Sequence, residues 1–178
     1  MGRTKRWQIK WLLSLVCLAL ATAAYFYQIP TSATEHKEAI LEAAQKLPQS
    51  GVLKKNWDGY IYLKVDDDYI HQLFPLIHEN GFHKPSSLHR PSRIGAHISV
   101  FYKDEAASRK PITEVGQSYS FRVKNFTHVS TKQKDYAIIE VDSPELEKLR
   151  EKYGLPPKLF NHEFHITIGD KNKRYYVP

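Results

Sequence analysis

The segment AIIEVDSPELEKL at residues 137–149 predicts a strand that leads directly into a helix. Aliphatic residues fill most of Ala137–Val141, as is typical of a buried strand. Asp142 or Ser143 then supplies a side-chain oxygen for the N-cap, and Pro144 takes the first helical position, where its missing N–H costs little. Glutamates in the first turn complement the positive end of the helix dipole. The segment therefore indicates a strand by its composition and the start of a helix by its capping residues.

An earlier segment, YLKVDDDYIHQL at residues 62–73, aligns with it as strand, aspartate cap and helix. In both places a polar loop that contains proline leads to another strand, in IGAHISVFY at residues 94–102 and in EFHITIGD at residues 163–170. The chain thus contains a weak internal repeat, a strand–helix–strand unit of about 40 residues that occurs twice. Two such units predict a bilobed α+β fold, with sheets facing a central cleft and helices outside.

Further elements are expected around this repeat. A helical pattern covers about Thr34–Leu47, and Pro48 follows it. The helix of the first unit is expected over about Asp67–Glu79, capped from within Asp66–Asp68 and ended by Gly81. The segment from Gln117 to Val129 and the residues after it, which contains SYSFRVKNF, predicts one or two strands between the units. At 178 residues, the chain is long enough for one such domain with a single core.

Each repeated unit finishes on a strand that carries the same tetrapeptide pattern, HISV from His97 and HITI from His165. Alternate side chains of a strand share a face. His97, Ser99 and Phe101 are therefore expected on one face of the first strand, and His165 and Thr167 on one face of the second. The aliphatic residues between them would be buried against helices. If a rough two-fold relates the units, both polar faces meet across one cleft.

Two facing imidazoles suit the cleavage of a phosphoester. One can take a proton from the nucleophile while the other protonates the leaving oxygen, and imidazole does both near neutral pH. The two hydroxyls can donate hydrogen bonds to the phosphate oxygens, where charge builds in the transition state. Such a site needs no metal, thiol, glycine-rich phosphate loop or cofactor. The alternative is that both histidines are structural, with their hydrogen bonds made within half-buried strands. The duplication of the pattern argues against this alternative.

These features resemble the two-histidine (2H) phosphoesterase superfamily, which includes RNA cyclic phosphodiesterases and 2′–5′ RNA ligase-like proteins. The family motif is His-x-Thr/Ser-x with apolar x, and the resemblance covers roughly Gly59–Asp170. It implies a bilobed α+β fold and metal-independent cleavage of phosphodiesters, often 2′,3′-cyclic phosphates or 2′–5′ linkages. Carried over by position, His97 and His165 would be acid and base, in an order that depends on the substrate. Ser99 and Thr167 would bind the phosphate.

Other side chains near the first motif are candidates for substrate binding. Arg90 and Arg93 precede it and could hold a phosphate, although a solvated basic loop is the alternative. Phe101 and Tyr102 follow it and could stack on a nucleobase, although packing at the edge is the alternative. The same cleft could also be lined by the two tyrosines on the polar face of the preceding strand, Tyr60 and Tyr62.

Two segments resemble metal sites without meeting their requirements. In HEFH, His162 and His165 are three residues apart before a strand, whereas the zinc-protease pattern needs a spacing of four on a helix. Asp66–Asp68 lack the glycine and the terminal glutamate of a calcium loop. We therefore expect no metal site.

Residues 1–33 predict a signal peptide or an N-terminal membrane anchor, which leaves 34–178 as the catalytic domain. Four basic residues precede an apolar run at Trp11–Tyr27, and no acid appears before Glu35. The domain would then be exported, as a periplasmic or secreted protein, or anchored on the non-cytoplasmic side. A buried core helix is the alternative. The only cysteine, Cys17, lies in this leader, so the domain itself can form no disulfide.

Together these features predict a metal-independent phosphodiesterase that acts on 2′,3′-cyclic phosphates or RNA-like phosphodiesters by paired-histidine catalysis. Its partners would be RNA, an oligonucleotide or a cyclic nucleotide, in keeping with a net charge of +7. We expect a monomer. A nucleotide- or RNA-end-binding module of the same fold without turnover, and an envelope interaction protein, are the alternatives.

Overall fold

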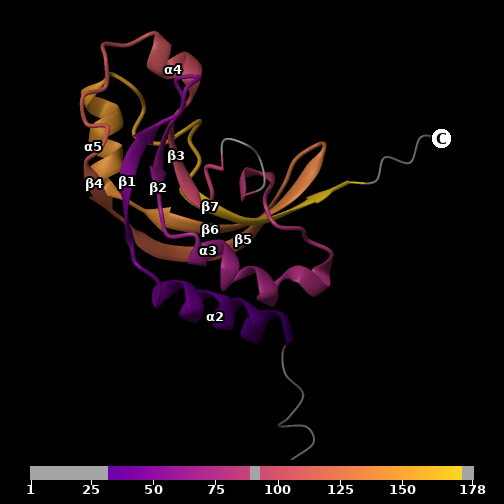
Figure 1. Ribbon diagram of the computed structural model, residues 1–178. Coiled ribbons are helices and arrows are strands. Elements are labelled where there is room, and N and C mark those ends of the chain that lie inside the picture. Colours follow the sequence, from indigo (N-terminus) through magenta and orange to yellow (C-terminus); the bar gives the residue numbers. More distant parts are fainter. Residues whose placement is uncertain (1–31, 89–92, 174–178) are drawn as a thin grey trace, which may run out of the picture. The chain divides into compact units, whose positions relative to one another are not determined.

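A computed structural model describes residues 32–88 and 93–173. The chain divides into two compact units, 1–36 and 37–178, and the second holds the repeat. Its central element is a strongly curled antiparallel sheet (Figure 1). Seven strands form it, in the order β4-β1-β2-β3-β7-β6-β5. Their bounds are β1 Ser50–Lys55, β2 Ile61–Lys64, β3 His97–Phe101, β4 Ser118–Ser120, β5 Arg122–Ser130, β6 Lys134–Asp142 and β7 Phe164–Asn172.

The described residues include four α-helices: α2 Ser32–Gln45, α3 Asp68–His71, α4 Lys103–Ala107 and α5 Pro144–Lys152. The α+β class and the predicted repeat are confirmed, since β2-α3-β3 and β6-α5-β7 are the two strand–helix–strand units. They meet edge to edge through β3 and β7, where Ile98 lies opposite Ile166. One continuous curled sheet therefore carries both units, and its centre is the seam between the two histidine strands.

The two units also interlock through their helices. The helix of the first unit, α3, packs against β7, and the helix of the second, α5, packs against β3. The side chains that alternate with the histidine motif, Ile98, Val100, Ile166 and Ile168, are completely buried in the shared core. The aliphatic positions of both tetrapeptides thus face the helices, which leaves the other face of the sheet for the histidines.

The predicted helix over Asp67–Glu79 is wrong in its length. The α-helix ends at His71, and single 3₁₀ turns follow at Phe74–Leu76 and His78–Asn80. Pro75 explains the break, because its ring removes an N–H and clashes with the preceding turn of an α-helix. Gly81 ends the last turn in the left-handed region, with φ of 77°. The α5 helix starts as predicted, with the Ser143 hydroxyl accepting a hydrogen bond from the Leu146 N–H.

The sequence pattern predicted neither β1 nor α4. In β1, the segment SGVLKK has only one buried side chain, Leu53, so its hydrophobic alternation is weak. It belongs to the sheet because β2 and β4 pair with it on either side. Long-range pairing rather than local pattern therefore decides this strand.

The predicted leader lies almost wholly outside the described residues, and its function as a signal or anchor stays a prediction. Among residues 32–88 and 93–173, no helix has the length and apolar character needed to cross a bilayer.

Candidate functional site

The two histidine motifs lie side by side on the face of the sheet that points away from the helices. The pairing of Ile98 with Ile166 sets His97 beside Thr167 and Ser99 beside His165, since the strands are antiparallel. All four side chains are half-buried. Each imidazole therefore neighbours the hydroxyl of the other motif, which is the arrangement that a two-fold related site requires.

Both imidazoles are held in the same way. The Nδ1 atom of His97 lies 2.8 Å from the Gly95 carbonyl oxygen, and that of His165 lies 3.1 Å from the Glu163 carbonyl oxygen. A carbonyl oxygen can only accept, so Nδ1 carries the proton in each ring. The Nε2 atom of each histidine is then left to exchange a proton with a ligand.

The surroundings of His97 are aromatic and cationic. The rings of Tyr60 and Tyr62 stand edge-on to the imidazole, with centroids 6.0 and 5.6 Å away. The hydroxyl groups of Tyr60 and Ser99 are hydrogen-bonded at 2.5 Å. Burial raises the pKa of Tyr60 well above its usual range, so its phenol stays protonated and can donate to Ser99. Lys64 lies opposite His97 on the neighbouring strand β2.

A short network fixes this half of the site. The Lys64 ammonium donates to the Asp67 carboxylate at 2.5 Å and to the Ala96 carbonyl at 3.3 Å, and the same carboxylate accepts the Ala96 N–H at 2.7 Å. Asp67 therefore holds the backbone before His97. Of the aspartates predicted to cap the helix, Asp66 accepts the Asp68 N–H at 3.0 Å, whereas the Asp67 side chain makes no capping bond. Burial lowers the pKa of His97, and the Lys64 cation adds to this effect.

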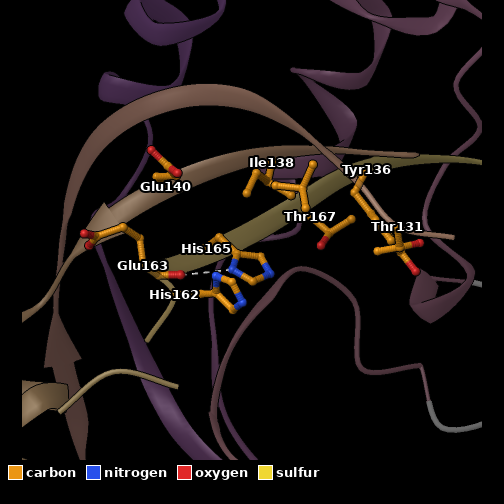
Figure 2. A pocket seen from close by; sticks show the side chains of 9 residues that line it. Thr131, Tyr136, Ile138, Glu140, His162, Glu163, His165 and Thr167 are labelled. Atoms are coloured by element: carbon orange, nitrogen blue, oxygen red, sulfur yellow. Dashed lines mark hydrogen bonds between the residues drawn. The ribbon is translucent and has the colours of Figure 1, made fainter. Parts of the chain in front are cut away.

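The surroundings of His165 form an open pocket of about 310 Å³ (Figure 2). On β6, Glu140 lies opposite His165 and Ile138 lies opposite Thr167, so these side chains share one face. The figure shows the His165 ring bonded at Nδ1 to the Glu163 carbonyl, with the His162 ring next to it. The pocket is also lined by Val129, Thr131 and Tyr136.

An aromatic row borders the site at the β3 end. Tyr102 stacks on Tyr60 at 6.2 Å and on Phe160 at 5.4 Å between ring centroids. Phe160 is 71% exposed and lies with Asn161 in a tight turn where both residues have positive φ, 48° and 61°. Such a conformation is strained for a non-glycine residue. A small cavity between Tyr102, Phe160 and His165 joins this row to the histidines.

The prediction that Phe101 shares the face of His97 is wrong. Ile61 pairs with Phe101 and Tyr62 pairs with Ser99, so Val100 is an extra residue in β3. This bulge reverses the alternation, and both Val100 and Phe101 are completely buried. Phe101 packs in the core, where no ligand can stack on it, and Tyr102 comes to the histidine side instead.

The binding role predicted for the two arginines stays a prediction. Arg90 lies outside the described residues, and Arg93 is exposed in the loop before β3 and does not line the two pockets described beside His165. In the part of the chain that the structure describes, no group of three or more metal-binding side chains is close enough to hold an ion.

Several residues of the site were not predicted as such from sequence: Glu140, His162, Glu163 and Phe160. Only Glu140 could have been found from the sequence. The alignment of YLKV with IIEV places it at the position of Lys64, on the strand that precedes each histidine strand in the repeat. His162, Glu163 and Phe160 come from a loop whose path depends on the tertiary structure.

Comparison with known proteins gives one match. The model of the family described as Swiss Army Knife, 2H phosphoesterase domain, matches residues 61–176. That range includes both histidine motifs and both repeated units. A search of curated proteins and a search of solved structures each gave no match.

Proposed function

Because the chain belongs to the 2H phosphoesterase family, we propose that it is a metal-independent phosphodiesterase that opens 2′,3′-cyclic phosphates or cleaves RNA-like phosphodiesters. The observation that carries this proposal is that both histidines are held in the same tautomer and orientation by equivalent contacts. Each donates a hydrogen bond from Nδ1–H to a backbone carbonyl, leaves Nε2 for the ligand and neighbours the hydroxyl of the other motif.

A phosphate held over the β3–β7 seam would meet all four groups. One neutral imidazole accepts the proton of the attacking hydroxyl or water, and the other, protonated, donates to the oxygen that leaves phosphorus. Ser99 and Thr167 donate hydrogen bonds to the non-bridging oxygens, where negative charge grows in the transition state. Ser99 is prepared for this by Tyr60, whose phenol can donate to the Ser99 oxygen and leave the Ser99 proton for the phosphate.

The aromatic row favours a nucleotide over a small phosphoester. Tyr102 and Phe160 border the cavity that reaches Ser99 and His165, and Phe160 offers an exposed ring. Stacking on an aromatic side chain is the usual way in which proteins hold unpaired bases. RNA, an oligonucleotide or a cyclic nucleotide is therefore the substrate class that we propose, with the protein acting as a monomer.

The test uses the full chain, purified in a mild detergent, with EDTA present. It is incubated with 2′,3′-cyclic nucleotides and with short 3′–5′ and 2′–5′ oligoribonucleotides. We expect turnover that resists EDTA and falls by about 10²–10⁴-fold in His97→Ala and in His165→Ala, because each variant loses one proton-transfer group.

His78→Ala is a matched control, since the Nδ1 atom of His78 also lies 2.7 Å from a backbone carbonyl, that of Pro75, but outside the site. It should keep full activity. Turnover that EDTA abolishes, or that survives the loss of either site histidine, would contradict the proposal. Nucleotide binding without turnover in a folded protein would instead support the binding-module alternative.

We also propose that residues 1–33 direct the domain out of the cytoplasm, as a signal or as an anchor. The proposal rests on the basic start and the apolar run Trp11–Tyr27.

A further inference from the structure

The pocket beside His165 extends well away from the histidine motifs. It measures about 310 Å³ and follows one face of β6, from Glu140 past Ile138 to Tyr136 (Figure 2). Cavities that hold small molecules in proteins start at about 300 Å³. A phosphate at the proposed site would occupy only the edge that His165 and Thr167 form, so the rest of the pocket has room for one further group of the substrate.

This pocket and the aromatic row lie on opposite sides of His165. A small cavity between Tyr102 and Phe160 reaches the same imidazole, and β7, which carries His165, lies between β3 and β6 in the sheet. A phosphodiester carries one ester-linked group on each side of its phosphorus. The two hollows can therefore take these two groups, one beside the aromatic row and the other over β6.

The walls of the pocket over β6 are mostly apolar. They are formed by Val129, Ile138 and the ring of Tyr136. The Thr131 hydroxyl also lies there, but it already donates to the Lys134 carbonyl at 2.9 Å and accepts the Lys134 N–H at 3.0 Å. A flat heteroaromatic ring can pack against such walls, whereas a choice among rings needs a polar group that is free to bind.

Glu140 supplies that polar group. One oxygen of its half-buried carboxylate accepts a hydrogen bond from the Asn125 amide at 3.0 Å, and the other oxygen has no hydrogen-bond partner among the described residues. None of the lysines, arginines and histidines that the structure describes lies within ion-pair distance of it. The neighbouring Glu163 differs, because it pairs with Lys158 at 2.7 Å and with Lys124 at 3.1 Å. Glu140 thus offers an oriented acceptor to whatever enters the pocket.

An acceptor of this kind distinguishes nucleobases by their edges. A carboxylate can only accept hydrogen bonds, so it selects ligands by their donors. Cytosine carries an amino group at the place where uracil carries a carbonyl oxygen, and adenine and guanine carry amino groups as well. An amino group can donate to the free oxygen of Glu140. A carbonyl oxygen would face the carboxylate as a second acceptor, and both would lose water without gaining a partner.

We propose that the pocket over β6 is a base-binding subsite in which Glu140 selects a base with an amino group, so that cytosine is preferred to uracil. This inference rests on the phosphodiesterase function proposed above and deepens it by naming the bases that the preferred substrates carry. Glu140 contacts the base and not the phosphorus. It is a specificity-determining residue.

The test compares substrates that differ at one base. The full chain is incubated with 2′,3′-cyclic CMP and UMP, and with the dinucleotides UpU, CpU and UpC, which place cytosine on either side of the phosphate. We expect kcat/KM to be about 10-fold higher for the substrate whose cytosine reaches Glu140 than for its uracil counterpart, because one hydrogen bond to a charged group separates the two.

Three variants separate base selection from other effects. Glu140→Gln keeps the size of the side chain, but its amide can also donate to a uracil carbonyl, so we expect the cytosine-to-uracil ratio of kcat/KM to fall to about one. Tyr136→Ala removes an apolar wall and should lower kcat/KM for both bases while the ratio stays high. Glu151→Gln removes an exposed carboxylate from α5, outside the pocket, and should leave both values unchanged.

Each outcome decides the inference. A cytosine preference that Glu140→Gln removes supports it. Equal turnover of the cytosine and uracil substrates by the wild-type chain, or a preference that persists in Glu140→Gln, overturns the inference and leaves the proposed function standing.

A wild-type chain that turns over none of the substrates overturns the proposed function instead. Calorimetric titration with 3′-CMP and 3′-UMP then tests the subsite by itself. Tighter binding of 3′-CMP that Glu140→Gln abolishes supports the subsite, whereas equal affinities, or a preference that this variant keeps, overturn it.

Discussion

At the scale of single residues, the site depends on how the backbone before each histidine is held. The carbonyls of Gly95 and Glu163 select the tautomer that leaves Nε2 for the ligand. Before His97 this carbonyl is positioned by Asp67, whose carboxylate accepts the N–H of the next residue, Ala96. The motif supplies the histidines proposed to react, and the backbone two positions earlier orients their rings.

Gly95→Ala should damage the site and the fold together. Gly95 has φ of 71°, and a Cβ atom added to it would lie 2.1 Å from Asp67 Oδ1 and 2.8 Å from Lys64 Nζ. The new methyl group must displace the network that holds His97. We expect the free energy of unfolding to fall by about 1–3 kcal/mol, and kcat to fall while the EDTA resistance stays. Urea unfolding and steady-state kinetics measure the two effects.

Gly116→Ala is the matched control, because Gly116 also has positive φ, 97°, but a Cβ atom there meets nothing within 4 Å. It should cost stability through backbone strain alone and leave kcat unchanged. Equal kcat values for the two variants would show that the Gly95 network does not position His97.

At the scale of elements, the bulge in β3 decides which aromatic residue reaches the site. Arg150 of α5 is completely buried and donates to the Val100 carbonyl at 2.5 Å and to the Pro156 carbonyl at 2.8 Å. It also binds both carboxylate oxygens of Glu105, which in turn accepts the Tyr102 N–H at 3.0 Å. One buried guanidinium thus joins the helix of the second unit to the bulge of the first.

Arg150→Met should be among the most destabilising substitutions in the domain. It leaves the Glu105 carboxylate and the Val100 carbonyl without their buried donor, and breaking such a pair costs about 3–5 kcal/mol. The free energy of unfolding in urea measures this loss. We also expect KM for nucleotides to rise, because Tyr102 loses its anchor.

Arg122→Met provides the comparison at the surface. Arg122 pairs with Asp142 at 2.6 Å, but its side chain is 80% exposed, so the pair is screened by water. Its loss should change stability by about 1 kcal/mol or less. A similar cost for both arginine variants would contradict the role given to Arg150.

At the scale of the whole molecule, the duplication brings the two histidine motifs together. Each helix packs against the last strand of the other unit, so neither unit can bury its apolar strand face alone. The two strands of the β3–β7 seam bury their aliphatic side chains in the core and carry the proposed site on their other face. The core and the proposed site therefore share the same contact, Ile98 with Ile166.

The leader prediction also belongs to this scale. We expect the full chain, produced in a Gram-negative bacterium, to be found in the periplasmic or membrane fraction and to be digested by protease added to spheroplasts. A chain that begins at Thr34 should stay in the cytoplasm, because it lacks the basic and apolar segments. Cytoplasmic, protease-resistant full chain would refute export.

The sequence by itself determined the α+β class, the two repeated units and the four groups of the histidine motifs, because period-two alternation and helix start signals are local. Only the tertiary structure decided that Phe101 is buried and that Phe160 borders the site. It also decided that Asp67 holds the backbone before His97. A bulge, a loop path and the hydrogen bond from the Ala96 N–H to Asp67 depend on residues distant in the chain, and no local pattern records them.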